Sequence, residues 1–247
     1  VLQPMRALYL RMPAVATLVL VIGAGYIIGG IRSALVVGGL TLFIALSPWW
    51  DRALVTLYMA TFGVFISTII GFTVGIISFQ NKHTANFMLG VCDIFQTFPS
   101  FVYLIPVMML FGVTDTSVLI AVVVYATIPA TRYTIEGLRS VPVALHDAAT
   151  MSGVTKLQRL LKIEFPLAFP HMMLGLNQTI VFALFMVIIG AFIGTEDLGQ
   201  YILKALSDKK GAGIGLTLGL CVAFIGLIFD HLIRTWVGQR KKHLGID

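Results

Sequence analysis

The stretch from Asp147 to Pro166 reads DAATMSGVTKLQRLLKIEFP and is a polar island in an otherwise apolar chain of 247 residues. Hydrophobic residues make up 58% of the sequence and charged residues 11%, whereas soluble domains carry roughly a quarter charged residues. Long uncharged runs, each approaching the roughly 20 residues that cross a bilayer, recur on both sides of the island. The composition therefore predicts an all-α integral membrane protein. A structured loop of this size indicates that a partner docks on it.

Apolar runs bounded by charged or turn residues predict about seven membrane spans. They cover residues 14–30, 34–48, 54–79, 86–111, 117–135, 172–194 and 213–236. We expect a tail and two peripheral spans in residues 1–52, a core domain in residues 53–237 and a basic tail in residues 238–247. Trp49 and Trp50 lie beside charged residues, as is typical of a membrane–water boundary. Cys92 and Cys221 lie in apolar runs, so they are expected to be small buried hydrophobes.

The distribution of Lys and Arg predicts the orientation in the membrane. One side of the predicted topology holds eleven basic residues: Arg32, Lys82, Arg132, Arg139, Lys156, Arg159, Lys162, Arg234, Arg240, Lys241 and Lys242. The other side holds six: Arg6, Arg11, Arg52, Lys204, Lys209 and Lys210. This bias places the loop of residues 136–171 and the C-terminus in the cytoplasm, and the N-terminus outside. The same bias explains the net charge of +6, so no nucleic acid partner is expected.

The island itself predicts two short helices. Ser140 can cap the first helix, with Pro142 in its opening turn, and Gly153 can end it in a left-handed conformation. Thr155 to Gln158 fits a capping box for the second helix. That helix is expected to stop near Phe165, because Pro166 cannot continue the hydrogen-bond ladder.

Two interpretations of the island follow. An amphipathic loop of this kind can lie on lipid headgroups. The spacing favours the other interpretation, because it resembles the cytoplasmic motif of importer permeases of the ATP-binding cassette (ABC) superfamily: Glu-Ala-Ala, three residues, Gly, nine residues, Ile-x-Leu-Pro. The matching positions here are Asp147, Ala148, Ala149, Gly153, Ile163 and Pro166. Asp147 replaces the Glu of the motif, and Phe165 replaces its Leu.

The resemblance implies a type I ABC-importer transmembrane domain with a cytoplasmic coupling helix. In that family the motif sits in a groove of a separate ATPase subunit. By this resemblance Asp147, Ala148, Ala149 and Gly153 lie at the ATPase contact, while Ile163 and Pro166 fix the loop to its own membrane domain. The chain contains no phosphate-cradling motif. We therefore expect it to bind no cofactor and to be no enzyme, with ATP and Mg²⁺ on the partner ATPase.

Residues 53–237 also resemble the permease subunits of glycine betaine/proline importers. The similarity rests on Phe95–Pro106 (FQTFPSFVYLIP), Gly175–Thr179 (GLNQT) and Leu198–Gln200. It implies a bacterial inner-membrane homodimer with two ATPase subunits and an extracytoplasmic substrate-binding protein or domain. The implied substrate is a small methylated amine: glycine betaine, choline, proline betaine or trimethylamine N-oxide. Another small polar solute, such as an amino acid, is the alternative, and an ATP-independent secondary transporter is a more distant one.

Polar and aromatic residues interrupt two of the spans and are candidates for a translocation pathway or gate. They are Asp93, Phe95, Gln96, Phe98, Pro99, Tyr103, Asn177 and Gln178. Polar groups at membrane depth usually face a bundle interior, and aromatic faces attract methylated cations. Packing in the protein core is the competing explanation for each ring.

Three further features have open interpretations. Gly71-x-x-x-Gly75 and Gly190-x-x-x-Gly194 can serve either homodimer contacts or packing within one subunit. Asp230 is expected to pair with Arg234, one helical turn further on. The loop of residues 195–212, with Lys209 and Lys210, is a candidate docking surface for the binding protein or an ordinary solvated loop.

Overall fold

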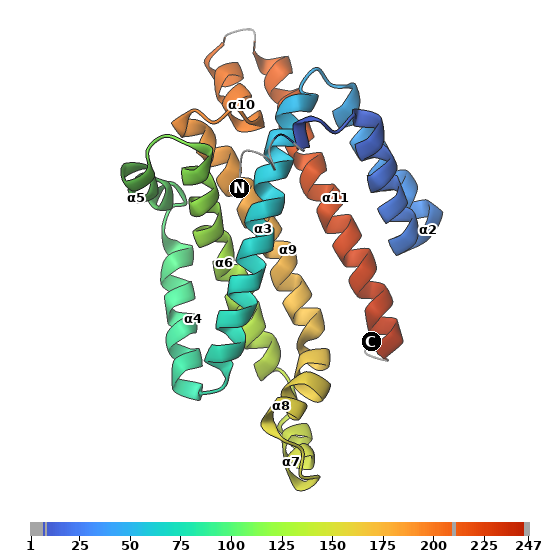
Figure 1. Ribbon diagram of the computed structural model, residues 1–247, viewed down its shortest axis with the longest axis vertical. Helices are drawn as coiled ribbons and strands as arrows, with labels where there is room; N and C mark the ends of the chain where they lie inside the picture. The colour runs from blue at the N-terminus through green and yellow to red at the C-terminus, as the bar shows by residue number, and fades with distance from the viewer. Residues whose placement is uncertain (1–6, 8, 209–210, 245–247) are drawn as a thin grey trace.

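The computed structural model describes residue 7, residues 9–208 and residues 211–244, and the side chains of 193 and 241–244 lie outside the description. The predicted all-α class is confirmed, since the elements within these ranges are helices (Figure 1). In chain order they are α2 (Ala14–Leu46), α3 (Trp50–Phe79), α4 (Lys82–Thr97), α5 (Phe101–Phe111), α6 (Asp115–Arg139), α7 (Val143–Met151), α8 (Lys156–Arg159), a π-helical turn (Leu160–Glu164), α9 (Phe165–Gly190), a 3₁₀ turn (Ala191–Ile193), α10 (Leu198–Ser207) and α11 (Ala212–Leu244).

Helices α3, α6 and α9 form the centre of the bundle, and glycines let them approach closely. A Cβ added to Gly71 would lie 2.4 Å from the Ala130 Cβ of α6, and one added to Gly190 would lie 2.6 Å from Val118. Helices pack this closely in membranes where small residues remove side-chain bulk. The glycines of both repeats that touch a neighbour therefore serve packing within the subunit, which is the second of the two interpretations.

Among the described residues, five helices are long and apolar enough to cross a membrane, or six if the bent pair α4–α5 counts as one span. The predicted single span 86–111 is wrong in shape, because α4 and α5 meet at a bend of 90°. Pro99 lies at the break. A proline disfavours the helical conformation of the residue before it, and Phe98 is extended at φ −72°, ψ 136°.

Helix α2 reverses direction at Gly30, which has φ 68° and ψ −162°. A Cβ on Gly25 would lie 2.6 Å from Val37, yet in a straight helix residues twelve apart are separated by about 18 Å. The predicted segments 14–30 and 34–48 are thus the two arms of a helical hairpin. Each arm is shorter than the roughly 20 residues that usually span a bilayer. The hairpin contacts α11 through Ser33 Oγ and His231 Nε2, 3.1 Å apart.

Different helices lie at the two ends of the bundle. Figure 1 shows α7 and α8 projecting from the lower end, where the turn between α3 and α4 and the end of α11 also lie. Helix α10 covers the opposite end. Residues 80–85, 136–171 and the end of α11 therefore share a side of the bundle, in the grouping that the sequence predicted.

Candidate functional site

The loop of residues 136–171 projects from the bundle as a short helix, α7, followed by a second, longer one. The predicted start of the first helix is wrong. Helix α6 extends to Arg139, so Ser140 ends it, and the Ser140 hydroxyl donates to the carbonyl of Gly137 at 2.7 Å. Pro142 stands at the N-cap of α7 instead, a place where its missing N–H leaves no hydrogen bond unmade.

The predicted end of α7 is confirmed. Gly153 has φ +71°, a conformation that L side chains rarely adopt. The N–H of Gly153 donates to Thr150 O at 3.1 Å, and the N–H of Val154 donates to Ala149 O at 3.2 Å. This pair of bonds is a Schellman motif, which satisfies the last carbonyls of a helix. Helix α7 is therefore a short helix whose C-terminal end is fixed by these two hydrogen bonds.

The second helix begins as predicted, with a capping box. Gln158 N donates to Thr155 Oγ1 at 3.3 Å, and Thr155 N donates to the Gln158 side chain at 3.0 Å. The predicted stop near Phe165 is wrong. The N–H of Phe165 donates to Leu160 O, five residues back, so one widened π-helical turn carries the chain past Pro166 into α9. Residues Lys156–Gly190 form one continuous stretch of 35 residues, which we call the rod.

Glu164 holds α7 against the rod. Its side chain is only 3% exposed, and its Oε1 lies 3.0 Å from His146 Nδ1 of α7 and 2.8 Å from Arg159 Nε of α8. A buried carboxylate needs such partners, because charge is costly to remove from water. One signal in the sequence could have predicted this contact, because Glu164 is an acidic residue between the apolar residues Ile163 and Phe165.

The six predicted motif residues divide between two surfaces. Asp147, Ala148 and Gly153 are exposed, whereas Ala149 is 4% exposed and faces inward. Ile163 and Pro166 are half-buried and line a cleft between α7 and the rod, together with Ala148 and Ala149. Two apolar side chains of α7 are strongly exposed, Val143 at 71% and Met151 at 91%. An exposed apolar end on a rigid helix fits a protein partner.

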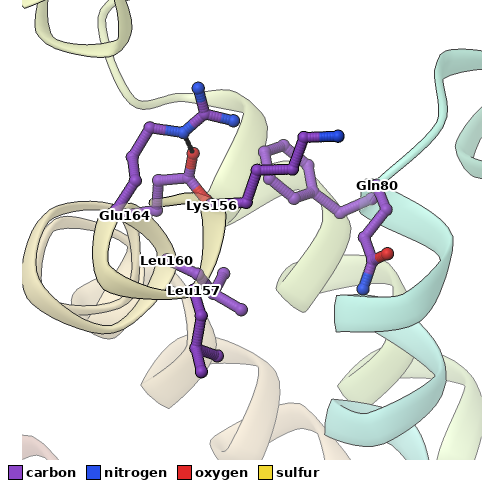
Figure 2. A pocket seen from close by; sticks show the side chains of 7 residues that line it. Gln80, Lys156, Leu157, Leu160 and Glu164 are labelled. Atoms are coloured by element: carbon purple, nitrogen blue, oxygen red, sulfur yellow. Dashed lines mark ion pairs between the residues drawn. The ribbon is translucent and has the colours of Figure 1, made fainter. Parts of the chain in front are cut away.

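A second cleft separates α8 from the end of α3 (Figure 2). Figure 2 shows Lys156 reaching across it toward Gln80, and a dashed line marks the ion pair of Glu164, whose partner is Arg159. Leu157 and Leu160 point the other way in the same view. The base of the loop is therefore attached through its own ion pairs and through α9, with open space on the side of α3.

A polar face on α4 and α6 is the second candidate site. Arg132 Nη1 donates to Asp93 Oδ1 at 2.5 Å and to Gln96 Oε1 at 3.2 Å, and Arg132 Nε donates to Glu136 Oε1 at 2.9 Å. A cavity opens beside this network. Its lining consists of Gln96, Pro129, Arg132, Tyr133, Glu136, Gln178 and Phe182. The sequence predicted Arg132 only as one of the basic residues that set the orientation, because its pairing with Asp93 and Gln96 of α4 joins residues far apart in the chain. Glu136, which was not predicted as a site residue, pairs with Arg132 one turn away within α6.

The structure brings together only some of the predicted pathway residues. Asp93 and Gln96 share the Arg132 network, and Gln178 lines the same cavity. Asn177 lies elsewhere: it is 8% exposed, and its Nδ2 donates to Asp230 Oδ1 of α11 at 2.8 Å. The neighbouring prediction is confirmed, since Arg234 Nε lies 2.6 Å from the same oxygen.

The predicted aromatic residues form part of a row of rings. Their centroids are separated by 6.3 Å for Phe98 and Phe95, 5.9 Å for Phe95 and Tyr103, and 5.2 Å for Tyr103 and Tyr125. The row ends on Phe182, 4.8 Å from Tyr125, at the edge of the polar cavity. Tyr103 is buried and its hydroxyl donates to Phe95 O, so core packing describes it well. Phe95, Phe98 and Pro99 are exposed at the α4–α5 bend.

The end opposite α7 carries a structured cap. The predicted loop 195–212 contains α10, and its Lys209 and Lys210 lie outside the described residues. Asp197 is fully buried and accepts hydrogen bonds from Gln200 N and Thr195 Oγ1, both at 3.0 Å. Burial raises the pKa of Asp197 to about 6, against these hydrogen bonds, which lower it.

An exposed cluster lies beside this cap. Arg52 pairs with Glu196 at 3.1 Å, and Tyr201 lies between the Arg52 guanidinium at 5.0 Å and the Lys204 ammonium at 4.9 Å. Cations this close to a ring face are attracted to it. These contacts group positive and negative side chains on one surface at this end of the bundle.

Known proteins resemble this chain over most of its length. Residues 63–243 match the family described as "binding-protein-dependent transport system inner membrane component". The chain is 98% identical over 246 residues to the trimethylamine N-oxide transport system permease protein TmoV of Pelagibacter ubique, covering 100% of this chain and 34% of that protein. It is 43% identical to TmoV of Ruegeria pomeroyi, covering 100% of this chain and 37% of that protein. The chain thus spans about a third of the length of these two relatives.

A shorter relative and a solved structure also resemble this chain. The glycine betaine transport system permease protein OpuAB of Bacillus subtilis is 32% identical over 80% of this chain and 69% of its own length. An inward-facing structure of the MetNI methionine ABC transporter superposes with TM-score 0.64 at 21% identity, over 75% of this chain and 93% of that one. This likeness confirms the predicted type I ABC-importer fold. From the match over residues 63–243 and from these relatives, the chain belongs to the family of binding-protein-dependent transport system inner membrane components.

Proposed function

We propose that this chain is the membrane-spanning permease part of an ATP-driven importer for trimethylamine N-oxide. The 98% identity to a protein named for trimethylamine N-oxide transport supports this substrate most strongly. Relatives at 30–34% identity are named for glycine betaine, proline betaine or carnitine. All of these molecules carry a methylated ammonium centre, so glycine betaine is the second candidate substrate.

The observation that carries the energy-coupling part of the proposal is helix α7. It is short, capped at Gly153, exposed at Asp147 and Ala148, and clamped to the rod by Glu164. Such a body can transmit the movement of a partner without deforming. We assign its contact to an ATPase subunit, present in two copies, which binds ATP and Mg²⁺. Ala149, Ile163 and Pro166 then hold α7 to its own membrane domain.

The remaining partners follow from the two ends of the bundle. The end with α7 faces the cytoplasm of a bacterial cell, together with the end of α11, and the segment before α2 starts outside. Helix α10 and the Arg52–Glu196 pair offer a surface for an extracytoplasmic substrate-binding protein or domain. A second copy of the permease covers the polar face of α4 and α6, so that Asp93, Gln96 and Gln178 line the pathway, with Phe95, Phe98, Pro99 and Tyr103 beside its gate.

Reconstitution tests the proposal. The permease is purified from its native membrane with its companion chains and placed in proteoliposomes. We expect uptake of labelled trimethylamine N-oxide that needs ATP inside and binding protein outside, with stimulated ATPase activity. Uptake driven by an ion gradient without any ATPase would support a secondary transporter and contradict the proposal. Stimulation by glycine betaine alone would shift the substrate to the second candidate.

A further inference from the structure

The polar face carries more charge than a lipid-facing surface tolerates. Arg132 lies seven residues before the end of α6 at Arg139, which is about 10 Å along the helix. The side chains of Asp93, Arg132 and Glu136 are 60%, 32% and 40% exposed in the single chain. Charged side chains at this depth normally face a bundle interior or a water-filled cavity. This face therefore points toward protein or water in the assembled transporter.

The charges of the network do not cancel. Two carboxylates, Asp93 and Glu136, surround one guanidinium, Arg132, so these three groups carry a net charge of −1. Each carboxylate contacts Arg132 through one oxygen. Arg132 and Glu136 line the cavity and Asp93 lies beside it, so the net negative charge of the network attracts a cationic centre to this place.

The cavity lining also suits a methylated ligand. Phe182 and Tyr133 contribute ring surfaces, and a trimethylammonium group has no hydrogen to donate, so it is recognised by ring faces and carboxylates. Gln178 and Arg132 contribute N–H donors on the same lining. Trimethylamine N-oxide carries its positive nitrogen and its hydrogen-bond-accepting oxygen on adjacent atoms. The lining thus contains groups that match the methyl groups and groups that match the oxygen.

We propose that this cavity between α4, α6 and α9 is a transit site that binds the dipolar, trimethylated amine inside the permease. Glu136 and Phe182 face the methylammonium end, and Arg132 and Gln178 donate to the oxygen. The inference rests on the proposed function and deepens it, because it assigns substrate discrimination to the permease as well as to the binding protein.

Ligand-observed NMR tests the site directly. The permease complex is placed in nanodiscs without binding protein, and saturation transfer to the methyl protons of three probes is compared. The probes are trimethylamine N-oxide, tetramethylammonium, which lacks the oxygen, and tert-butanol, which has the shape but no charge. We expect the strongest transfer for trimethylamine N-oxide and the weakest for tert-butanol.

Two variants separate the two halves of the cavity. Glu136→Gln should lower transfer to tetramethylammonium about tenfold, as expected for the loss of one charge contact. Gln178→Leu should lower transfer to trimethylamine N-oxide while leaving tetramethylammonium unchanged. Asp51→Asn, which removes an exposed carboxylate in the first turn of α3, is the matched control and should change neither. If the complex that carries Glu136→Gln fails to assemble, the Gln178→Leu and Phe182→Leu variants test the transit site in its place.

Equal transfer in the wild type and in these variants, or equal transfer for all three probes, would overturn the transit site. Uptake in proteoliposomes with binding protein is measured in parallel. Import of trimethylamine N-oxide without a saturation-transfer signal would refute only the transit site. Absence of import by the wild-type complex would refute the proposed function itself.

Discussion

The substitution Glu164→Gln tests the clamp between α7 and the rod. Gln keeps the size of the side chain and one oxygen acceptor, but it removes the charge. Hydrogen bonds to charged groups contribute about 1 kcal/mol more than neutral ones. Only one charged contact of Glu164 crosses from the rod to α7, at 3.0 Å to His146, because Arg159 belongs to the rod itself. The variant should therefore destabilise the attachment of α7 by about 1 kcal/mol.

Hydrogen exchange measures this loss where it occurs. A loss of about 1 kcal/mol in the stability of the attached loop corresponds to roughly 5-fold faster exchange. We expect that acceleration in the amides of α7, with unchanged exchange in α3 and α6. In the proposed transporter the same variant should keep its basal ATPase activity and transport less substrate per ATP, since α7 then moves independently of the rod.

Glu196→Gln is the matched control, because Glu196 also pairs with an arginine, but its side chain is 61% exposed. Exposed pairs contribute little to stability, so no acceleration is expected there. Exchange in α7 within twofold of the wild type after Glu164→Gln would refute the role assigned to the clamp.

The remaining predictions concern three other positions. Gly153→Ala should cost about 1 kcal/mol, because its φ of +71° is unfavourable for L side chains, and exchange at the end of α7 should accelerate while the span helices stay unchanged. Gly71→Leu should lower the thermal unfolding temperature in detergent, since its Cβ alone would lie 2.4 Å from Ala130, whereas Gly219→Leu, with nothing within 4 Å, should not. Burial raises the pKa of Asp197 to about 6 from 3.8, so the folded state binds more protons than the unfolded state between these values. Stability should therefore fall as pH rises from about 4 to 6, and melting curves of Asp197→Asn should lose that dependence.

Local signals in the sequence predicted parts of the loop of residues 136–171 well. Gly153 and the Thr155–Gln158 capping box depend on residues within one or two turns, and both formed as expected. The prediction that the second helix ends before Pro166 was wrong for a local reason as well. A proline ends a regular helix, but a single π-helical turn removes the conflict, and no feature of the residue itself announces that turn.

The polar face could be predicted only in part, because its defining contacts join distant residues. Asp93 and Gln96 are conspicuous as polar residues in an apolar run, whereas Arg132 appeared to be an ordinary basic residue at the end of a span. Only the packing of α4 against α6 places the guanidinium between the carboxylates of Asp93 and Glu136. Asn177 and Gln178 are adjacent in the sequence but point in different directions from α9. Asn177 contacts Asp230 of α11, and only Gln178 lines the cavity.

The rod makes the loop and the cavity wall a single lever arm. Its 35 residues from Lys156 to Gly190 extend about 50 Å, and they include both Gln178 and Phe182 of the cavity lining. A tilt of about 5° at one end would swing the other by on the order of 4 Å over that length. That travel is comparable with the diameter of a small solute, so a modest pivot near the membrane surface would suffice to reshape the chamber, without a relay of side chains between them.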